Sequence, residues 1–307
     1  MTTDTRTYKR VSKGVKPVGY KSLASKIFIY AGLVLYFVWL FFPFLIIIIT
    51  SFATDAELLG SLSFVWMPKP SIEGYRLIFT VDPNAVNGVS SLIIGFFNVL
   101  WQAMIPTVSG LIVSGLAAFA YAKYDFPGRN KLFAANLLLM TIPLSAGMTS
   151  YLFYNAIGWT KGGASVLPLI IPGMFGSAGL IFFMYPYIKS VPTGIIEAAK
   201  IDGMGFFRIF FTVVMPLSTP VFLAQFLFGF VGYYNNYSNA LIYLMNEKSL
   251  WTLQLALDQI CTYVAGSGGY MNAQCAAVVI SILPILVLYC FVQKSFISGL
   301  TAGSVKG

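Results

Sequence analysis

Six long apolar stretches constrain the fold of this chain more than any other feature of its sequence. A helix that crosses the hydrocarbon core of a bilayer needs about 20 mostly apolar residues. Each stretch reaches that length and none contains an acidic residue; they cover residues 27–52, 92–121, 132–159, 166–187, 220–244 and 273–292. The sequence therefore predicts an all-α membrane protein with six transmembrane helices.

The amino-acid composition supports lipid as the main solvent. Only 9% of the residues are charged and 58% are hydrophobic, whereas a soluble domain carries about 25% charged residues. The net charge of +9 could suggest a nucleic-acid partner. The basic residues flank the apolar stretches, however, and such residues set membrane orientation. We therefore expect a lipid bilayer and no nucleic acid as partner.

The distribution of Lys and Arg predicts the topology. Fifteen of them lie in the N-terminal arm, the second and fourth connections and the C-terminal tail, and four lie in the other connections. The richer side faces the cytoplasm, so both termini are expected there, in a bacterial cytoplasmic (inner) membrane. The first stretch has no obvious cleavage site and is expected to be an anchor helix. The expected organisation is a basic arm (1–26), a transmembrane domain (27–292) and a cytoplasmic tail (293–307).

The chain lacks the groups that would let it power transport itself. All ten acidic residues fall outside the six stretches, and there is no histidine, so a proton relay at membrane depth has no obvious material. No phosphate-binding loop is present either. We expect no catalytic residue and no metal site. Energy for uphill transport would have to come from a partner on the cytoplasmic face. Whether Cys261 and Cys275 pair outside the cytoplasm is open.

A charged loop, residues 190–218, connects the fourth and fifth stretches. Pro192 suits a first helical turn because its fixed φ and missing N–H cost little there. Gly203 can adopt the left-handed conformation that ends a helix. The sequence predicts a short helix over 192–202 and a second over about 206–214, which Pro216 would break. Together they would form an elbow below the membrane.

The spacing within this loop resembles the EAA motif of ATP-binding-cassette (ABC) importer permeases. That pattern is Glu-Ala-Ala, three residues, Gly, nine residues, Ile, one residue and Leu-Pro. Val213 and Met215 are conservative departures, and the identical positions are Glu197, Ala198, Ala199, Gly203 and Pro216. The segments "FPGRNKLF" (126–133) and "VQKSFISGLTAGSVKG" (292–307) are similar to the maltose-type, MalG-like branch of sugar permeases.

The resemblance implies a type I ABC importer permease fold whose EAA helix is a coupling helix. Such a helix docks into a cleft on a cytoplasmic ATPase subunit. Ala198, Ala199 and Gly203 would allow close approach, Glu197 would meet a basic group, and Asp202 and Pro216 complete the expected coupling set.

The implied partners are a sister permease, two ATP-binding cassette subunits and an extracytoplasmic sugar-binding protein. The permease pair is expected to be a heterodimer. ATP and Mg would bind to the ATPases, and this chain would bind no cofactor. Rival hypotheses are an ABC permease for a polyamine or glycerol phosphate, an ion-coupled transporter or channel, and a membrane assembly protein without a transport route.

Two polar aromatic clusters are candidates for a sugar route, because sugar pockets combine aromatic walls with a few placed polar groups. The first comprises Tyr233, Tyr234, Asn235, Asn236, Tyr237 and Asn239, and the second Tyr154 and Asn155 beside Tyr151. Relatives in the family often read Trp-Asn-Asp-Phe in the first cluster. Here the carboxylate is missing, which would suit an acidic sugar. The alternative explanation for both clusters, and the favoured one for the second, is interhelical hydrogen bonding together with interfacial aromatic anchoring.

Overall fold

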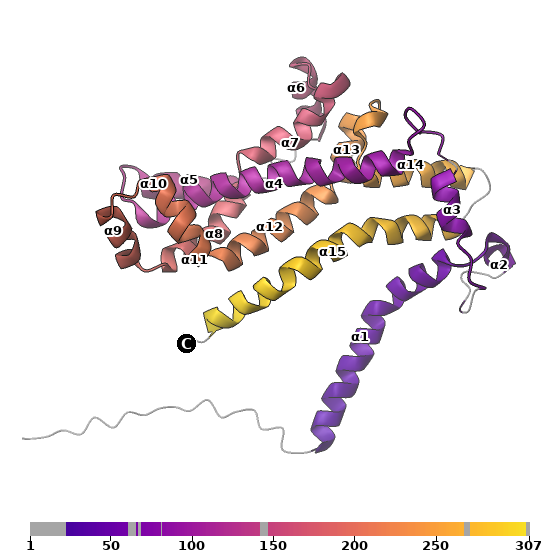
Figure 1. Ribbon diagram of the computed structural model, residues 1–307, viewed down its shortest axis with the longest axis horizontal. Coiled ribbons are helices and arrows are strands. Elements are labelled where there is room, and N and C mark those ends of the chain that lie inside the picture. Colours follow the sequence, from indigo (N-terminus) through magenta and orange to yellow (C-terminus); the bar gives the residue numbers. More distant parts are fainter. Residues whose placement is uncertain are drawn as a thin grey trace, which may run out of the picture. The chain divides into compact units, whose positions relative to one another are not determined.

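The structure is a computed structural model that describes residues 23–60, 66, 69–80, 82–141, 147–266 and 271–304. Within these residues every regular element is a helix. The chain forms two units, Met1–Ile46 and Ile47–Gly307. The first unit contains most of α1 (Leu23–Ser51), a helix with Pro43 in its interior. The other elements in Figure 1 belong to the second unit.

Helix α4 (Ser91–Lys123) organises the second unit. Its start is well capped, because the Ser90 side chain accepts a hydrogen bond from the Leu92 N–H and the Asp82 carboxylate accepts one from the Ser91 N–H at 2.6 Å. A negative charge there also complements the helix dipole. Four helices pack along α4: α7 (Leu167–Met174), α8 (Ala178–Ser190), α12 (Thr219–Tyr234) and α14 (Leu253–Gly266).

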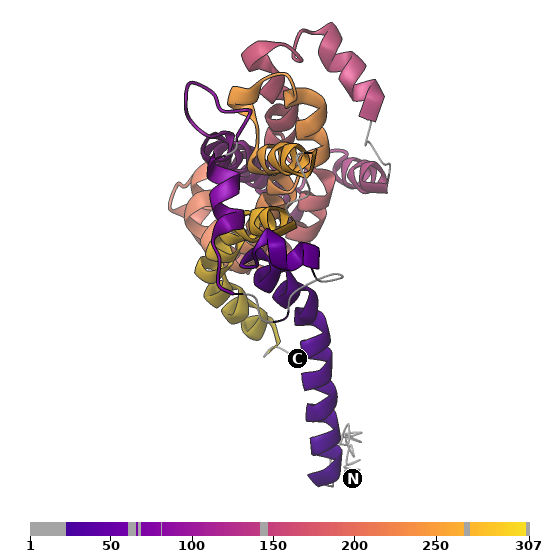
Figure 2. The ribbon, with the colours of Figure 1, turned by 90° about the vertical axis from the view of Figure 1, so that its right-hand side faces the viewer.

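The remaining elements extend from this centre. Figures 1 and 2 show the long α15 running in broadly the same direction as α4 and α12. The element bounds are α2 (Asp55–Gly60), α3 (Glu73–Thr80), α5 (Arg129–Thr141), α6 (Gly147–Ala156), η1 (Gly162–Val166), α9 (Thr193–Ile201), α10 (Phe206–Ile209), η2 (Phe210–Val214), α11 (Met215–Leu217), α13 (Tyr237–Leu244), η3 (Lys248–Leu250) and α15 (Met271–Ser304).

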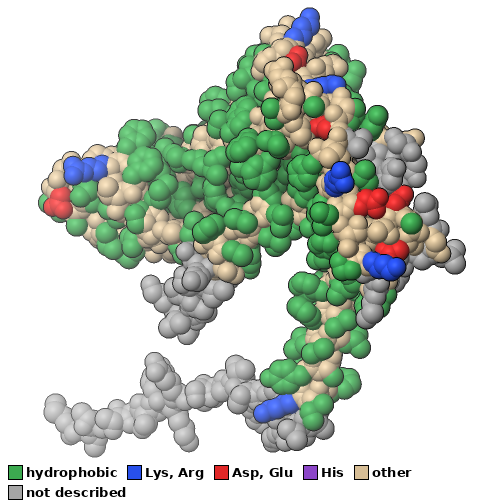
Figure 3. Space-filling model, turned by 45° about the vertical axis from the view of Figure 1, so that its right-hand side comes forward, with side chains coloured by type: hydrophobic (Ala, Val, Ile, Leu, Met, Phe, Trp, Pro, Cys, Tyr) green, Lys and Arg blue, Asp and Glu red, His purple; other side chains and the backbone are tan. Residues whose placement is uncertain are grey.

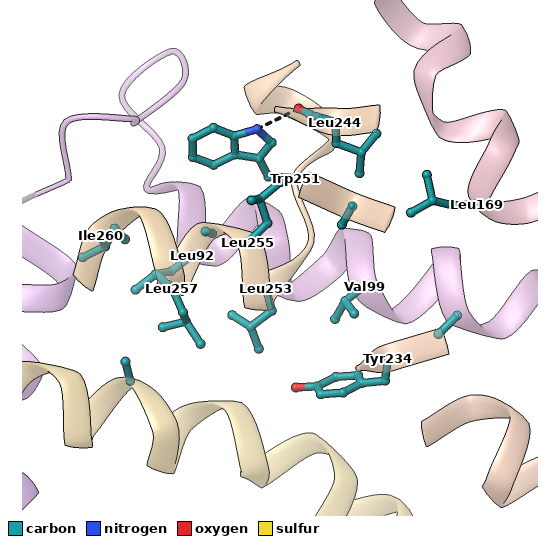
Figure 4. Packing of buried hydrophobic residues seen from close by; sticks show 14 of the residues in the cluster. Leu92, Val99, Leu169, Tyr234, Leu244, Trp251, Leu253, Leu255, Leu257 and Ile260 are labelled. Atoms are coloured by element: carbon teal, nitrogen blue, oxygen red, sulfur yellow. Dashed lines mark hydrogen bonds between the residues drawn. The ribbon is translucent and has the colours of Figure 1, made fainter. Parts of the chain in front are cut away.

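Two clusters of buried side chains form the core of the second unit. The first surrounds the early part of α4 and includes Trp251, whose indole N–H donates to the Leu244 carbonyl at 2.9 Å (Figure 4). The second surrounds the late part of α4 and includes Phe119, Met184 and Phe210. The helix thus links one cluster to the other.

Helices α4 and α7 approach each other closely at two glycines. A Cβ added at Gly110 would overlap with the Gly173 carbonyl, and one added at Gly173 would overlap with Pro106 and Tyr233. Small residues allow helix backbones to approach closely in membrane proteins, where packing drives association. Glycine is therefore required at both positions.

Four helices in the described part of the chain are long and apolar enough to cross a membrane: Ser25–Ser51, Ser91–Lys123, Gly162–Ser190 and Met271–Gln293. A fifth candidate is the pair Phe206–Leu217 and Thr219–Tyr234, which is bent by 87°. The predicted span 132–159 is divided between α5 and α6, and residues 142–146 lie outside the described residues. An integral membrane protein is confirmed, while six spans stay a prediction.

Contacts place the connecting segments at the two ends of α4. Near its start, the Asn98 side chain donates to the Ser249 carbonyl at 2.8 Å. At its end, the Lys123 ammonium donates to the Lys189 carbonyl at 2.8 Å. On the face seen in Figure 3, apolar side chains cover the middle of the second unit and charged side chains gather toward its ends. The predicted cytoplasmic and external connections of this unit therefore lie at opposite ends.

Candidate functional site

The predicted helix of the charged loop is present as α9 (Thr193–Ile201), with Pro192 as its N-cap. Gly203 has a φ of +77° and ends it. The Met204 N–H donates to the Ala199 carbonyl and the Gly203 N–H to the Lys200 carbonyl, both at 3.0 Å. This is the Schellman arrangement, which satisfies the last carbonyls of a helix. The turn that closes α9 is therefore fixed by its own hydrogen bonds.

The two alanines of the motif differ in burial. Ala199 is only 5% exposed and packs in the second core cluster of this chain, whereas Ala198 is exposed. Glu197 and Asp202 are exposed as well. A Cβ at Gly203 would meet open space. The outer surface of the elbow thus comprises Glu197, Ala198, Asp202 and Gly203. Ala199 points into the core and anchors α9 there.

The second arm of the elbow is longer than predicted. The chain is helical from Phe206 to Leu217, and its middle, η2, is a π-helical segment. Pro216 was expected to break the helix, but the helix continues past it and the sharp bend comes at Ser218. Such π turns re-satisfy backbone groups that a proline leaves without a partner. The wider turn before Pro216 accounts for the difference.

Aromatic rings and a lysine attach the elbow to the end of α4. The Phe206 ring packs against the rings of Phe119 and Tyr124, with centroids 5.0 Å and 5.3 Å apart. The Lys200 ammonium lies 4.5 Å from the Tyr124 ring centroid, a cation–π distance. Burial raises the pKa of the Tyr124 phenol, so this ring stays neutral. Lys123 also donates to the Val191 carbonyl just before α9.

The first predicted sugar-route cluster contains a break in the helix. The Tyr237 N–H donates to the Asn235 carbonyl at 2.8 Å across Asn236, whose φ and ψ are −79° and 57°. These angles define an inverse γ-turn. It separates α12 from α13, so the predicted span 220–244 is not one continuous helix. Non-helical backbone at membrane depth occurs where it is buried in protein or lines a wet cavity.

The three tyrosines of this cluster diverge. Tyr234 is 1% exposed, and its hydroxyl donates to the Ser281 carbonyl of α15 at 2.7 Å. Tyr233 lies against Gly173 of α7. Tyr237 donates to Asp258 Oδ2 of α14 at 2.9 Å. The structure therefore uses Tyr234 for packing between helices and directs Tyr237 to a carboxylate.

The asparagines of the cluster remain near the break. The Asn239 amide donates to Asn236 Oδ1 at 2.8 Å. Asn235 and Asn239 are exposed and Asn236 is half-buried. Asn235 and Asn239 are therefore accessible from outside this chain, and the amides of Asn236 and Asn239 are paired with each other.

The second predicted cluster joins the first through α13. The Tyr154 ring lies edge-on to the Tyr243 ring at 5.8 Å and stacks on the Trp159 ring at 5.7 Å. Asn155 Oδ1 accepts a hydrogen bond from the Thr160 hydroxyl at 2.7 Å, and the residue is exposed. Tyr154 is thus mainly part of an aromatic stack.

Sequence reasoning missed a polar stripe on α14. Gln254, Asp258 and Thr262 recur every four residues and so share one helix face. This spacing was a readable signal in an otherwise apolar segment. It also corrects one expectation: a carboxylate is not missing beside the first cluster, because α14 brings Asp258 to Tyr237. The expectation of an acidic sugar stays a prediction.

The helices long enough to span a membrane define an integral membrane protein. No protein-family model matches the chain. The permease protein YtcP of the polygalacturonan/rhamnogalacturonan transport system of Bacillus subtilis is 32% identical over 91% of this chain and 97% of its own. The permease protein AraQ of the arabinooligosaccharide transport system of Bacillus subtilis is 32% identical over 87% of this chain and 90% of its own.

A solved structure has the same fold. A chain of a bacterial ABC transporter involved in the import of the acidic polysaccharide alginate superimposes with a TM-score of 0.76 at 21% identity, over 91% of this chain and 99% of that chain. The chain belongs to the family of permease proteins of ABC sugar transport systems. It is a membrane-embedded transport subunit, as the resemblance of the EAA segment implied.

Proposed function

We propose that this chain is one permease of a binding-protein-dependent importer that moves an oligosaccharide inward by alternating access. A sister permease forms the other half of the route, and two ATPase subunits bind ATP and Mg and drive the change of state. An extracytoplasmic binding protein delivers the sugar. Alternating access requires only that the membrane domain has an inward-facing and an outward-facing state, and that closure of the ATPase pair favours one of them.

The elbow at the end of α4 is the observation that carries this proposal. Ile201 and Phe207 are 86% and 64% exposed on it. Exposed apolar side chains beside exposed acids form the kind of surface that docks to a partner. The residues that would contact the ATPase are Glu197, Ala198, Asp202 and Gly203. Ala199 would anchor the elbow from within, and the exposed Pro216 would shape its second arm. Phe206 and Lys123 would pass its movement to α4.

The oligosaccharide class is supported by relatives with several different sugars. Three of these similar permeases belong to transport systems named for polygalacturonan/rhamnogalacturonan, arabinooligosaccharides and maltodextrin. The route would pass the helix break at Asn235 and Asn236 and the face of Tyr237. Tyr233, Asn239, Tyr154 and Asn155 would line it further on, and Tyr234 would hold α15 in place.

The proposed topology has six spans with both termini in the cytoplasm of a bacterium. Residues 1–26 form the arm, 27–292 the permease domain with the coupling loop 190–218, and 293–307 the tail. The helix α15 continues into the tail as far as Ser304. In this topology α9 faces the cytoplasm, where the ATPases would dock. Cysteine accessibility labelling at residue 205 and at residue 90 tests the two sides.

ATP-driven uptake in proteoliposomes is the test of the function. The chain would be purified with the ATPases and sister permease encoded with it and supplied with the cognate binding protein. We expect binding-protein-stimulated ATP hydrolysis, and loss of that stimulation in Glu197→Ala with basal hydrolysis retained. Thr193→Ala is a matched control, because Thr193 is exposed on the same helix outside the motif.

Uptake driven by an ion gradient without ATPases would contradict the proposal. Normal binding-protein stimulation of ATP hydrolysis in Glu197→Ala would be compatible with ATP-driven transport. It would show that Glu197 is not needed for contact with the ATPase.

A further inference from the structure

A hollow of about 630 Å³ lies between α13, α14 and α15. Its polar lining includes the side chains of Tyr237, Gln254, Asp258, Thr262, Gln274 and Ser281. A volume of this order is in the range of small-molecule sites. The three helices follow one another in the sequence, and the hollow forms only where they pack together.

Asp258 is the charged group of the hollow, and it is only partly used. Its Oδ2 accepts hydrogen bonds from the Tyr237 hydroxyl at 2.9 Å and from the Gln259 amide at 3.2 Å. Both recorded bonds go to this one oxygen. An ionised carboxylate can accept about four hydrogen bonds, so Oδ1 is available to the hydroxyls of a ligand.

Gln254 supplies a second group that calls for a ligand. Both polar atoms of its amide are buried, and the amide interacts with the Tyr234 hydroxyl. In the described part of the chain, however, neither atom makes a hydrogen bond of good geometry. A buried amide without a well-formed hydrogen bond is costly. A molecule with several hydroxyls that displaced this weak contact would pair with the amide and with Asp258 Oδ1 together.

The charge of the hollow restricts what that molecule can be. Among the described residues that line it there is no Lys or Arg, and no ion pair to Asp258 is present. A carboxylate on the ligand would meet the Asp258 carboxylate without a compensating cation. Like charges at short range repel, most strongly where water is limited.

We propose that this hollow binds the hydroxyl groups of neutral sugars, and that Asp258 makes it selective for neutral oligosaccharides over uronates. The proposal rests on the proposed function, because it assumes that sugar passes this chain. In this proposal, the selectivity between neutral and acidic sugars comes from Asp258, a residue outside the predicted sugar route. Asp258 acts here through hydrogen bonds and charge, and it takes part in no reaction.

Cys261 provides a built-in reporter, because it also lines the hollow. Burial raises the pKa of its thiol to about 11, so labelling is best done near pH 9, where more thiolate is present. The intact transporter would be treated with a cationic and an anionic methanethiosulfonate, and labelling of the Cys261 peptide would be followed by mass spectrometry. We expect Asp258→Asn to lower the cation-to-anion rate ratio about tenfold.

Protection from labelling tests the ligand class. Maltotriose, arabinotriose and trigalacturonate would be added in turn to the wild-type transporter and to Asp258→Asn. We expect a neutral trisaccharide to slow labelling of Cys261 in the wild type severalfold, and trigalacturonate to do so only in the variant. Glu73→Gln is the matched control, since it removes one exposed carboxylate on α3 that does not line the hollow.

Equal protection by trigalacturonate in the wild type, an absence of protection by every neutral probe, or an unchanged rate ratio in Asp258→Asn would each overturn the proposal. The melting temperature of each variant shows whether it is folded. Failure of the proposed function can be distinguished from failure of this inference. If the proposed function fails, ATP-driven uptake is absent while the labelling pattern persists. If only the further inference fails, uptake remains and the labelling pattern is lost.

Discussion

The Phe206 ring stacks on the Phe119 ring, with centroids 5.0 Å apart and an interplanar angle of 29°. Phe119 is fully buried near the end of α4, and Phe206 begins the second arm of the elbow. The contact joins a connecting loop to the central helix of the fold. A displacement of α9 and α10 by a partner would therefore be transmitted to α4 through packed rings.

Removing this ring should uncouple the elbow. Phe206→Ala leaves a cavity beside Phe119, and we expect a loss of about 2 kcal/mol in stability because Phe206 is partly buried. Binding-protein-stimulated ATP hydrolysis should fall more than basal hydrolysis. Phe207→Ala is the control, since Phe207 is 64% exposed. It should leave the melting temperature unchanged and weaken only the association with the ATPases. Equal melting temperatures for the two variants would contradict the buried role of Phe206.

Gly203 should tolerate substitution poorly because of its backbone and not because of space. Its φ is +77°, and a Cβ there would contact nothing within 4 Å. An L-residue in this conformation costs about 1 kcal/mol. We expect Gly203→Ala to loosen the end of α9, as measured by faster exchange of the amide at position 203 and of the Met204 amide. Gly205→Ala, whose φ of −75° suits any residue, should not change the exchange. Slow exchange in both variants would count against the strain argument.

Tyr234 should prove structural. Tyr234→Phe removes the hydroxyl that donates to the Ser281 carbonyl and keeps the ring in place. We expect a loss of about 1 kcal/mol in stability and an unchanged preference among sugars in uptake assays. Tyr289→Phe, which alters an exposed tyrosine on α15, serves as the control for stability. A changed sugar preference in Tyr234→Phe would return Tyr234 to the sugar route.

The segment after α1 should loosen in acid. The Glu57 carboxylate accepts hydrogen bonds from the Lys69 and Thr54 N–H groups, each at 3.1 Å. These bonds lower its pKa from the ordinary 4.5. A lowered folded pKa means that the stabilisation is fully present above about pH 4.5 and is lost as the pH falls through the lower folded value. The difference in melting temperature between wild type and Glu57→Gln should therefore shrink from pH 6 toward about pH 3. A constant difference would sink this prediction.

The elbow shows how far local sequence reasoning reaches. Pro192, the short helix and the left-handed Gly203 were predicted from residue chemistry, and all three are present. These features depend on contacts within about ten residues. The inward orientation of Ala199 was not predicted, because it depends on packing against helices far away in sequence. The expected break before the fifth stretch is present, but it falls after Leu217 and not at Pro216 itself.

The candidate sugar route shows where such reasoning ends. The polar tyrosines and asparagines near 232–244 were correctly singled out as unusual. Their directions were not predictable, because Tyr234 meets Ser281 and Tyr237 meets Asp258 only after α14 and α15 pack. The same packing creates the hollow around Asp258.

The sequence by itself determined that the chain is a helical membrane protein of the ABC sugar permease type with a slim charged elbow. The length of the apolar stretches, their basic flanking residues and the spacing of the motif are properties of residues that are close in the sequence. They can therefore be identified from the sequence alone. Only the tertiary structure decided which face of α9 is buried, where the helix of span five breaks, and which carboxylate stands beside Tyr237. Each of these depends on side chains that are distant in the sequence and close in space, so packing decides them.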